Sequence, residues 1–308
     1  MRPVLHALLS GLFCVLYLGH GAASAQATSS DRSSNISEAL RDLDQQNNES
    51  RARMGVALSE AEKVVKQVTD AVVRRDCVGA VAALNIGLSK GLPEVITLAG
   101  AMYEEGLCVK PNWDRAVSLY QRAANAGHPG VAARLAAGYA SASGGRDKAA
   151  ALWWAVRAKT ALPTACTPAA SVDDPDRFVA ALQAWPAGRL DACAYTAAVM
   201  ANIQAEAEGE GPSLASSFGL VGKIRVVFVP EKGSLDIVDE LSEGANTGNL
   251  SADGVAIQAE RRNARRNFVS GLRLRADSGF KRFDKPSALP AEWRAEAAHD
   301  IRPATAVR

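Results

Sequence analysis

The sequence predicts a mainly α-helical protein, in which stacked helical hairpins form an α-solenoid and a small α+β module follows them. The first observation is a stretch that repeats itself after 36 residues: Gly91 and Tyr103 recur as Gly127 and Tyr139. A fixed period of this length is typical of arrays of helical hairpins. The second observation is that the apolar residues change from helical to alternating spacing after residue 217. Both patterns concern the chain that follows an N-terminal export signal.

Residues 1–25 have the pattern of a signal peptide. Arg2 gives a positive start, residues 4–18 are mostly apolar, and Ala23-Ser24-Ala25 supplies small residues for cleavage. The apolar run is shorter than the ~20 residues that span a bilayer. We therefore expect cleavage after Ala25 and a mature chain without an integral membrane segment. High alanine and arginine content favours a bacterial source with GC-rich DNA, and hence the periplasm as location.

The composition excludes one class of partner and predicts a flexible leader. The formal net charge is +2, and no basic face is dense enough to indicate nucleic-acid binding. Residues 26–50 are rich in Ser, Asn, Asp and Gln, with few apolar side chains. Such a segment cannot bury enough apolar surface to fold by itself, so we expect it to be flexible.

The cysteines of the mature chain predict two disulfides. Removal of the signal segment leaves Cys77, Cys108, Cys166 and Cys193. An even number in an oxidising compartment indicates disulfides, and four cysteines allow three connectivities. The spacings lack the close pairs of a zinc site. We favour the pairs that are near in sequence, Cys77 with Cys108 and Cys166 with Cys193, each stabilising the fold by roughly 3–4 kcal/mol.

Residues 51–207 are expected to form the repeat domain. A helix over residues 51–75 caps the array, and one complete unit runs over residues 94–127. Gly127 can adopt the left-handed conformation that ends a helix. Pro129 cannot extend that helix but suits the first turn of the next.

At this unit the chain resembles the Sel-one-like repeat family, a relative of the tetratricopeptide repeats. The family pattern is Leu-Gly-x-x-Tyr-x-x-Gly-x-Gly-Val, followed by Asp-x-x-Lys-Ala-x-x-Trp-Tyr-x-x-Ala-Ala-x-x-Gly. The matching residues are Ala99, Gly100, Tyr103, Gly106, Cys108, Val109, Asn112, Arg115, Ala116, Leu119, Tyr120, Ala123, Ala124 and Gly127. With weaker units on either side, the resemblance covers residues 77–161. It implies a stack of hairpins that binds other proteins.

The resemblance also bears on one disulfide. Cys108 stands where the family has its second loop glycine, and Cys77 is equivalent to Trp113 at the start of a second helix. In such a stack the loop of one unit lies close to that start in its neighbour. A Cys77–Cys108 bridge would then join two adjacent units.

The repeat pattern fades after residue 162, and a boundary follows. We expect a degenerate hairpin over residues 163–207, tied by Cys166 and Cys193, as the C-terminal cap of the array. Residues 208–217 begin with Glu-Gly-Glu-Gly-Pro, which predicts a linker between two domains.

Residues 218–285 are expected to form the small α+β module. Alternating apolar residues predict strands at 223–229 and 234–241, a helix over 251–267 and a third strand at 269–275. The order strand, strand, helix, strand is faintly similar to the C-terminal domain of TonB-like envelope proteins. Residues 286–308 are expected to be a mostly disordered tail with a short helix around Trp293.

No residue pattern indicates catalysis, a cofactor or a metal. His128 and His299 are the histidines of the mature chain, and neither has partners at catalytic or metal-ligand spacing. We expect no enzyme activity and no cofactor.

The expected function is therefore a non-catalytic periplasmic adaptor or regulator that binds other periplasmic or envelope proteins. Stacked hairpins generally bind partners on the face lined by their first helices. The candidate residues of this face are Thr97, Ala101, Glu104, Glu105 and Arg134. The alternative is a structural component of an envelope or secretion complex, anchored through the C-terminal module, and an unrecognised enzyme ranks third. The partner and the oligomeric state stay open.

Overall fold

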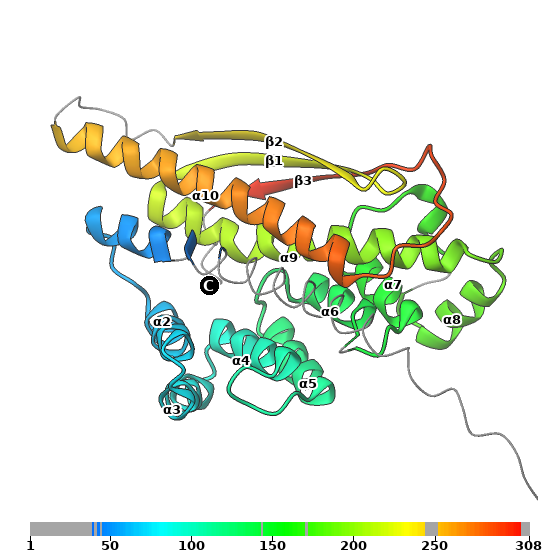
Figure 1. The fold of residues 1–308 in the computed structure, drawn as a ribbon, viewed down its shortest axis with the longest axis horizontal. Coiled ribbons are helices and arrows are strands. Elements are labelled where there is room, and N and C mark those ends of the chain that lie inside the picture. Colours follow the sequence, from blue (N-terminus) through cyan, green and yellow to red (C-terminus); the bar gives the residue numbers. More distant parts are fainter. Residues whose placement is uncertain are drawn as a thin grey trace, which may run out of the picture. The chain divides into compact units, whose positions relative to one another are not determined.

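The computed structural model describes residues 39, 42–43, 45–142, 144–169, 172–243 and 252–302. The chain divides into two compact units, residues 1–39 and 40–308, and the helical hairpins and the sheet belong to the second. The predicted signal peptide, residues 1–25, and the beginning of the predicted leader lie outside the described residues. The described part is mainly helical, with a small antiparallel sheet (Figure 1).

The N-terminal helices differ from the prediction. Residues 45–53 are helical, although the sequence predicts that residues 45–50 belong to a flexible leader. The single helix expected over residues 51–75 is interrupted, because Gly55 adopts φ +68° and α2 (Glu60–Val73) starts anew. Ser59 caps α2 by accepting from the Glu62 N–H while the Glu62 carboxylate accepts from the Ser59 N–H. The leader prediction is thus wrong for residues 45–50.

Consecutive helices then pair as hairpins. The pairs are α2 with α3 (Cys77–Ser89), α4 (Pro93–Glu105) with α5 (Trp113–Asn125), and α6 (Val131–Ala140) with α7 (Lys148–Arg157). Every second helix starts with the same device: Asp76, Asn112 and Asp147 each accept the N–H three residues further on. The repeated spacing of the sequence therefore appears in the structure as a repeated helix cap.

Glycine allows the helices of the central hairpin to lie close together. A Cβ added at Gly100 would lie 2.5 Å from the Tyr120 ring, which is fully buried. Any larger residue at this position would push α4 away from α5. This contact fits the Gly and Tyr positions of the repeat pattern.

The expected linker is helical. A 3-10 turn (Thr164–Cys166) and α8 (Pro175–Gln183) lead to α9, which runs without interruption from Arg189 to Phe218. Residues 208–217, predicted as a linker, belong to this helix. Gly209, Gly211 and Pro212 suggest a loop by composition, but Leu214, Ala215 and Phe218 beyond them are buried, and this burial holds the helix together.

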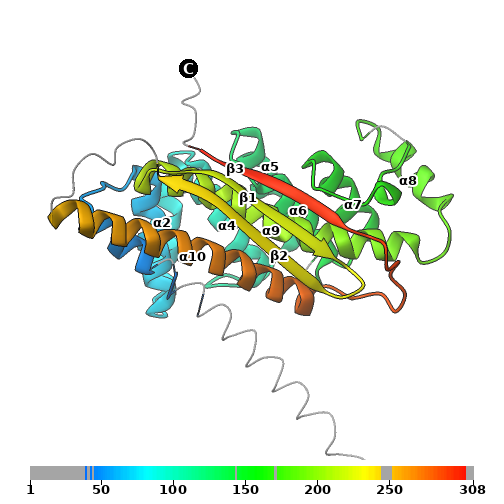
Figure 2. The same cartoon turned by 90° about the horizontal axis from the view of Figure 1, so that it is seen from above.

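A sheet of three antiparallel strands completes the described fold. Its order is β2 (Ser234–Glu243), β1 (Leu220–Val229), β3 (Ala295–Ile301). Central β1 pairs Val226 with Ile237 on one side and with Ala297 on the other. One face of the sheet lies on α9 and on α10 (Ala252–Arg282), as Figures 1 and 2 show.

Two predictions for the C-terminal part are wrong. Residues 269–275 lie inside α10, because Ala264, Phe268, Leu272 and Ala276 continue a buried row at helical spacing. The third strand is β3, within the tail that the sequence predicts to be mostly disordered. The region around Trp293 is not helical. The order strand, strand, helix, strand holds, but with a different third strand.

The core shows that the hairpins and the sheet are not separate domains. Buried residues of α6, α9, α10 and all three strands form one apolar cluster, which includes Val199 of α9, Phe228 of β1 and Leu272 of α10. The α9 helix lies between the sheet and the hairpins (Figure 1). The domain boundary predicted at residues 208–217 is therefore wrong, because these residues belong to α9, which packs on both the hairpins and the sheet.

Candidate protein-binding site

The predicted binding face is partly closed by a buried polar cluster. Its centre is Tyr120 of α5, whose hydroxyl donates to Glu104 Oε2 at 2.8 Å and accepts from Arg134 Nε at 2.9 Å. Glu104 is buried and Arg134 half-buried. Burial raises the pKa of Tyr120, so the phenol stays protonated and can donate to Glu104. The Tyr120 hydroxyl thus connects Glu104 of α4 with Arg134 of α6.

Helix α10 covers the same cluster from a distant part of the sequence. Arg282 forms an ion pair with Glu104 and lies 3.4 Å from Glu105 Oε1. The cluster therefore connects α4, α5 and α6 to the last turn of α10. A partner protein could reach Glu104 only by displacing Arg282.

The other predicted residues of this face provide little surface that a partner could contact. Thr97 and Ala101 are half-buried, and the Thr97 hydroxyl donates to the Pro93 carbonyl at 2.9 Å. Glu105 is exposed. The five residues predicted from the repeat pattern do not form one open surface.

The open apolar surface lies instead on α3. This helix carries no charged residue between Cys77 and Ser89. Val78 is 84% exposed and Ile86 is 53% exposed, and Ala82 and Asn85 between them are exposed as well. These residues recur at spacings of three and four, so they share one face of the helix. We call Val78, Ala82, Asn85 and Ile86 the α3 strip.

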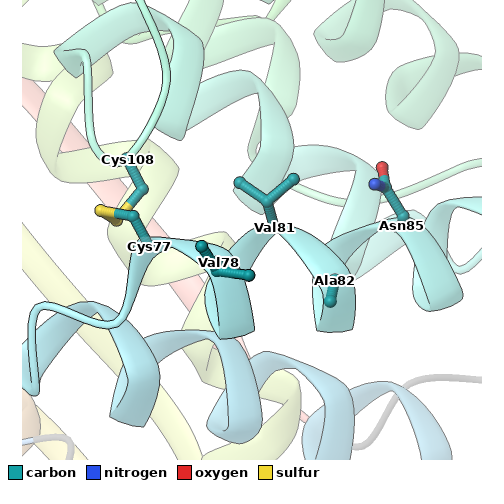
Figure 3. A pocket seen from close by; sticks show the side chains of 6 residues that line it. All are labelled: Cys77, Val78, Val81, Ala82, Asn85 and Cys108. Carbon is teal, nitrogen blue, oxygen red and sulfur yellow. A yellow bond between two sulfur atoms is a disulfide. The ribbon is translucent and has the colours of Figure 1, made fainter.

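A shallow hollow beside a disulfide adjoins the α3 strip. Figure 3 shows Val78 next to the Cys77–Cys108 bond, with Val81 and Asn85 projecting from α3 further along the helix. Leu107, which precedes Cys108 in the α4–α5 loop, is 44% exposed and adds apolar surface at the same end. The hollow and the strip together form an apolar surface on the first hairpins.

Two disulfides hold the helices around this region and at the other end of the hairpins. Cys77 at the start of α3 is bonded to Cys108 in the α4–α5 loop, and Cys166 is bonded to Cys193 of α9. These are the two pairs that the sequence favours. Cys108 adopts φ +59°, the left-handed conformation for which the repeat pattern has glycine. Two disulfides suit an oxidising compartment outside the cytoplasm.

Among the residues described, no group of three or more His, Cys, Asp or Glu side chains is arranged to hold a metal ion. His128 lies at a turn, with Nδ1 2.9 Å from the Pro129 carbonyl oxygen. His299 lies on β3, where burial lowers the pKa of its imidazole. These histidines lie in different parts of the fold.

No family model, no curated protein and no solved structure matches the chain. In the part of the chain that the structure describes, no helix is both long enough and apolar enough to cross a membrane.

Reasoning from the repeat pattern missed the α3 strip, although a signal is present in the sequence. The segment Cys77–Ser89 is apolar on all sides and uncharged, which is typical of a helix buried on every face. In the structure, α3 packs mainly on α2 and also on α4, and Val78, Ala82 and Ile86 stay exposed. A helix that is apolar on all sides but packs mainly on two neighbours therefore leaves apolar side chains exposed.

Proposed function

We propose that this protein is a non-catalytic periplasmic adaptor or regulator that binds other envelope proteins. Its hairpins form a Sel-one-like repeat solenoid, and the α3 strip is its binding surface. No catalytic or cofactor role is assigned to any residue. The observation that carries the proposal is an exposed, uncharged helix face placed beside a disulfide.

The α3 strip fits an apolar partner segment. Exposed apolar patches of monomeric proteins mark interaction sites when they are contiguous, and Val78, Ala82 and Ile86 are contiguous along one helix face. No charge on α3 has to be desolvated when a partner covers it. An amphipathic helix that lays its apolar side along α3 is the simplest occupant.

The disulfide supports this surface by fixing its geometry. Cys77–Cys108 holds the start of α3 against the α4–α5 loop, so Val78 and Leu107 keep their relative positions. A preorganised surface loses less conformational entropy on binding. The role of the bond would be to keep the apolar residues in place as well as to stabilise the fold.

The test is site-specific photocrosslinking in the periplasm of the native organism. A benzophenone side chain replaces Ala82 on the α3 strip, and adducts are identified by mass spectrometry. We expect a defined adduct that disappears when Val78→Lys and Ile86→Lys are added. Both side chains are largely exposed, so each substitution should change the free energy of unfolding by no more than about 0.5 kcal/mol.

A matched control uses exposed valines elsewhere. Val179 on α8 is 42% exposed and Val255 on α10 is 54% exposed, so Val179→Lys with Val255→Lys makes the same change in charge. This variant should keep the adduct. Two results would refute the α3 strip as the binding surface. One is a crosslink that persists when Val78→Lys and Ile86→Lys are combined. The other is a crosslink that this double variant and the control double variant remove equally.

A further inference from the structure

The two outer edges of the sheet, along β2 and along β3, differ in how they are protected from pairing with a further strand. At the edge of β2, the Asp239 side chain turns towards α10 and accepts from the Leu241 N–H at 3.0 Å. Arg265 of α10 donates to Asp239 Oδ2 at 2.5 Å and also contacts the Asp239 carbonyl oxygen. Charged residues that turn inward on an edge strand prevent another strand from pairing there. The β2 edge is therefore blocked.

The edge of β3 has no comparable protection. Within the described ranges, β3 pairs with β1 along one side, and no hydrogen bond connects its other side to a further element. Figure 2 shows β3 as an outer strand of the sheet. A row of unpaired N–H and C=O groups is a template for another extended chain. Three of the seven residues of β3 are alanine, and the side chains of a strand project above and below the sheet, so they leave the edge accessible.

The side chains of β3 indicate which chain fits. Ala297 and His299 lie on the helix-covered side, whereas Glu296, Ala298 and Asp300 are exposed on the open face. Glu296 and Asp300 therefore present two carboxylates on either side of a small residue. A strand added along β3 would place its own side chains opposite these three.

The charges of Glu296 and Asp300 favour a basic segment over a second copy of this chain as the added strand. If a second copy paired through β3 centred on Ala298, Glu296 of each copy would lie opposite Asp300 of the other. Like charges directly opposite each other are destabilising. An extended segment with Lys or Arg two residues on either side of a small residue would place a cation opposite each carboxylate.

We propose that the outer edge of β3 is a second interaction site, which binds an extended basic segment of another protein as an additional strand. Its backbone groups pair with β3, and two basic side chains, four residues apart, contact Glu296 and Asp300. The site is independent of the α3 strip, because it lies on the sheet and uses backbone pairing rather than an apolar surface.

The probe is the peptide Thr-Lys-Val-Thr-Val-Lys-Thr, blocked at both ends and labelled with fluorescein. It places Lys, Thr and Lys on one face, and it reads the same in both directions, so it suits either strand orientation. Binding to the full mature chain is measured by fluorescence anisotropy at about 0.15 M salt, which screens distant charges. We expect saturable binding, and protection of the amides of residues 295–301 from hydrogen exchange in the complex.

A matched pair of variants tests the charges. Glu296→Lys on the open edge should weaken binding about threefold or more, because it replaces an attraction by a repulsion. Asp236→Lys makes the same change at an exposed position of β2, whose edge is blocked, and should alter binding less than about twofold. Equal weakening by both variants would show general electrostatic attraction and would overturn the proposal.

N-methylated peptides test the backbone pairing. One peptide carries methyl groups on the backbone nitrogens of its odd residues and the other on those of its even residues. An added strand donates hydrogen bonds from alternate residues only, so one peptide should lose binding and the other keep it. Equal binding by both, or no saturable binding up to about 1 mM, would overturn the proposal. A doubled mass of the free protein in light scattering, abolished by Glu296→Lys, would identify a second copy as the occupant instead and refute the choice of a basic partner.

Discussion

The continuity of α9 through residues 208–217 gives the sharpest test of the fold, because two neighbouring glycines are predicted to respond in opposite ways. A Cβ at Gly209 would meet no atom within 4 Å. Gly209→Ala should therefore stabilise the protein by about 0.5–1 kcal/mol, the difference in helix propensity between the two residues.

The same substitution two residues later meets β3. A Cβ at Gly211 would lie 2.9 Å from Cδ1 of Ile301, whose side chain is 2% exposed. Ile301 must then move within a packed core, which costs about 1–3 kcal/mol and outweighs the gain in helix propensity. Gly211→Ala should be neutral to destabilising by about 2 kcal/mol.

The assay is urea unfolding of the full mature chain with its disulfides intact, followed by circular dichroism. Ile301→Val removes the obstructing methyl group, and in that background Gly211→Ala should stabilise the protein as Gly209→Ala does. The double-mutant cycle should give a coupling of about 1–3 kcal/mol between residues 211 and 301. If all of these glycine substitutions change the free energy of unfolding by less than about 0.3 kcal/mol, the segment behaves as a linker and the reasoning fails.

Two further predictions concern buried polar groups. Tyr120→Phe deletes the hydroxyl that Glu104 and Arg134 share and should lower the free energy of unfolding by about 1–3 kcal/mol. The Tyr103 hydroxyl forms no hydrogen bond within the described residues, so Tyr103→Phe should change the free energy of unfolding little. Equal effects of the two substitutions in urea unfolding would count against the polar cluster. Burial lowers the pKa of His299 below 6.5, so the unfolded chain binds the proton more readily, and stability should fall as the pH drops from 6.5 to the lowered pKa of the folded state. Urea titrations at several pH values should show that His299→Gln removes this part of the pH dependence, and an unchanged slope would contradict the burial of the imidazole.

The sequence predicted the features that depend on local chemistry. Gly127 follows the end of α5 with φ +79°, and the alternating residues around Val226 form β1 with β2. Both depend on contacts between residues that are near in the chain. Short-range patterns are sufficient there because caps, turns and hairpins are stabilised by neighbours in sequence.

The features that the sequence did not predict depend on distant contacts. Gly209 and Pro212 favour a loop locally, but packing of α9 against the sheet keeps the segment helical. β3 is rich in alanine and charged residues and has low strand propensity, yet it pairs because β1 offers it a free edge. Glu104 was expected at an open surface, and its partner Arg282 is separated from it by 178 residues. Only the folded chain reveals such a partner.

Four charged residues of α10 each form an ion pair with a residue of another element, and these pairs fix the position of α10 along its axis. Glu260 pairs with Arg53 at 2.6 Å, Arg265 with Asp239 at 2.5 Å, and Arg275 with Glu206 at 2.8 Å, while Arg282 pairs with Glu104.

Each of these four contacts reaches a different element: the helix at 45–53, β2, α9 and α4. Apolar packing alone is not directional, so a helix with a long buried row such as Ala264, Phe268 and Leu272 could shift by one turn at moderate cost. A shift of one turn would break all four charged contacts together and leave the buried carboxylate of Glu104 without Arg282, which is more costly. The charged residues of α10 therefore act chiefly on register, and their substitution should loosen the arrangement of the elements before it unfolds any of them.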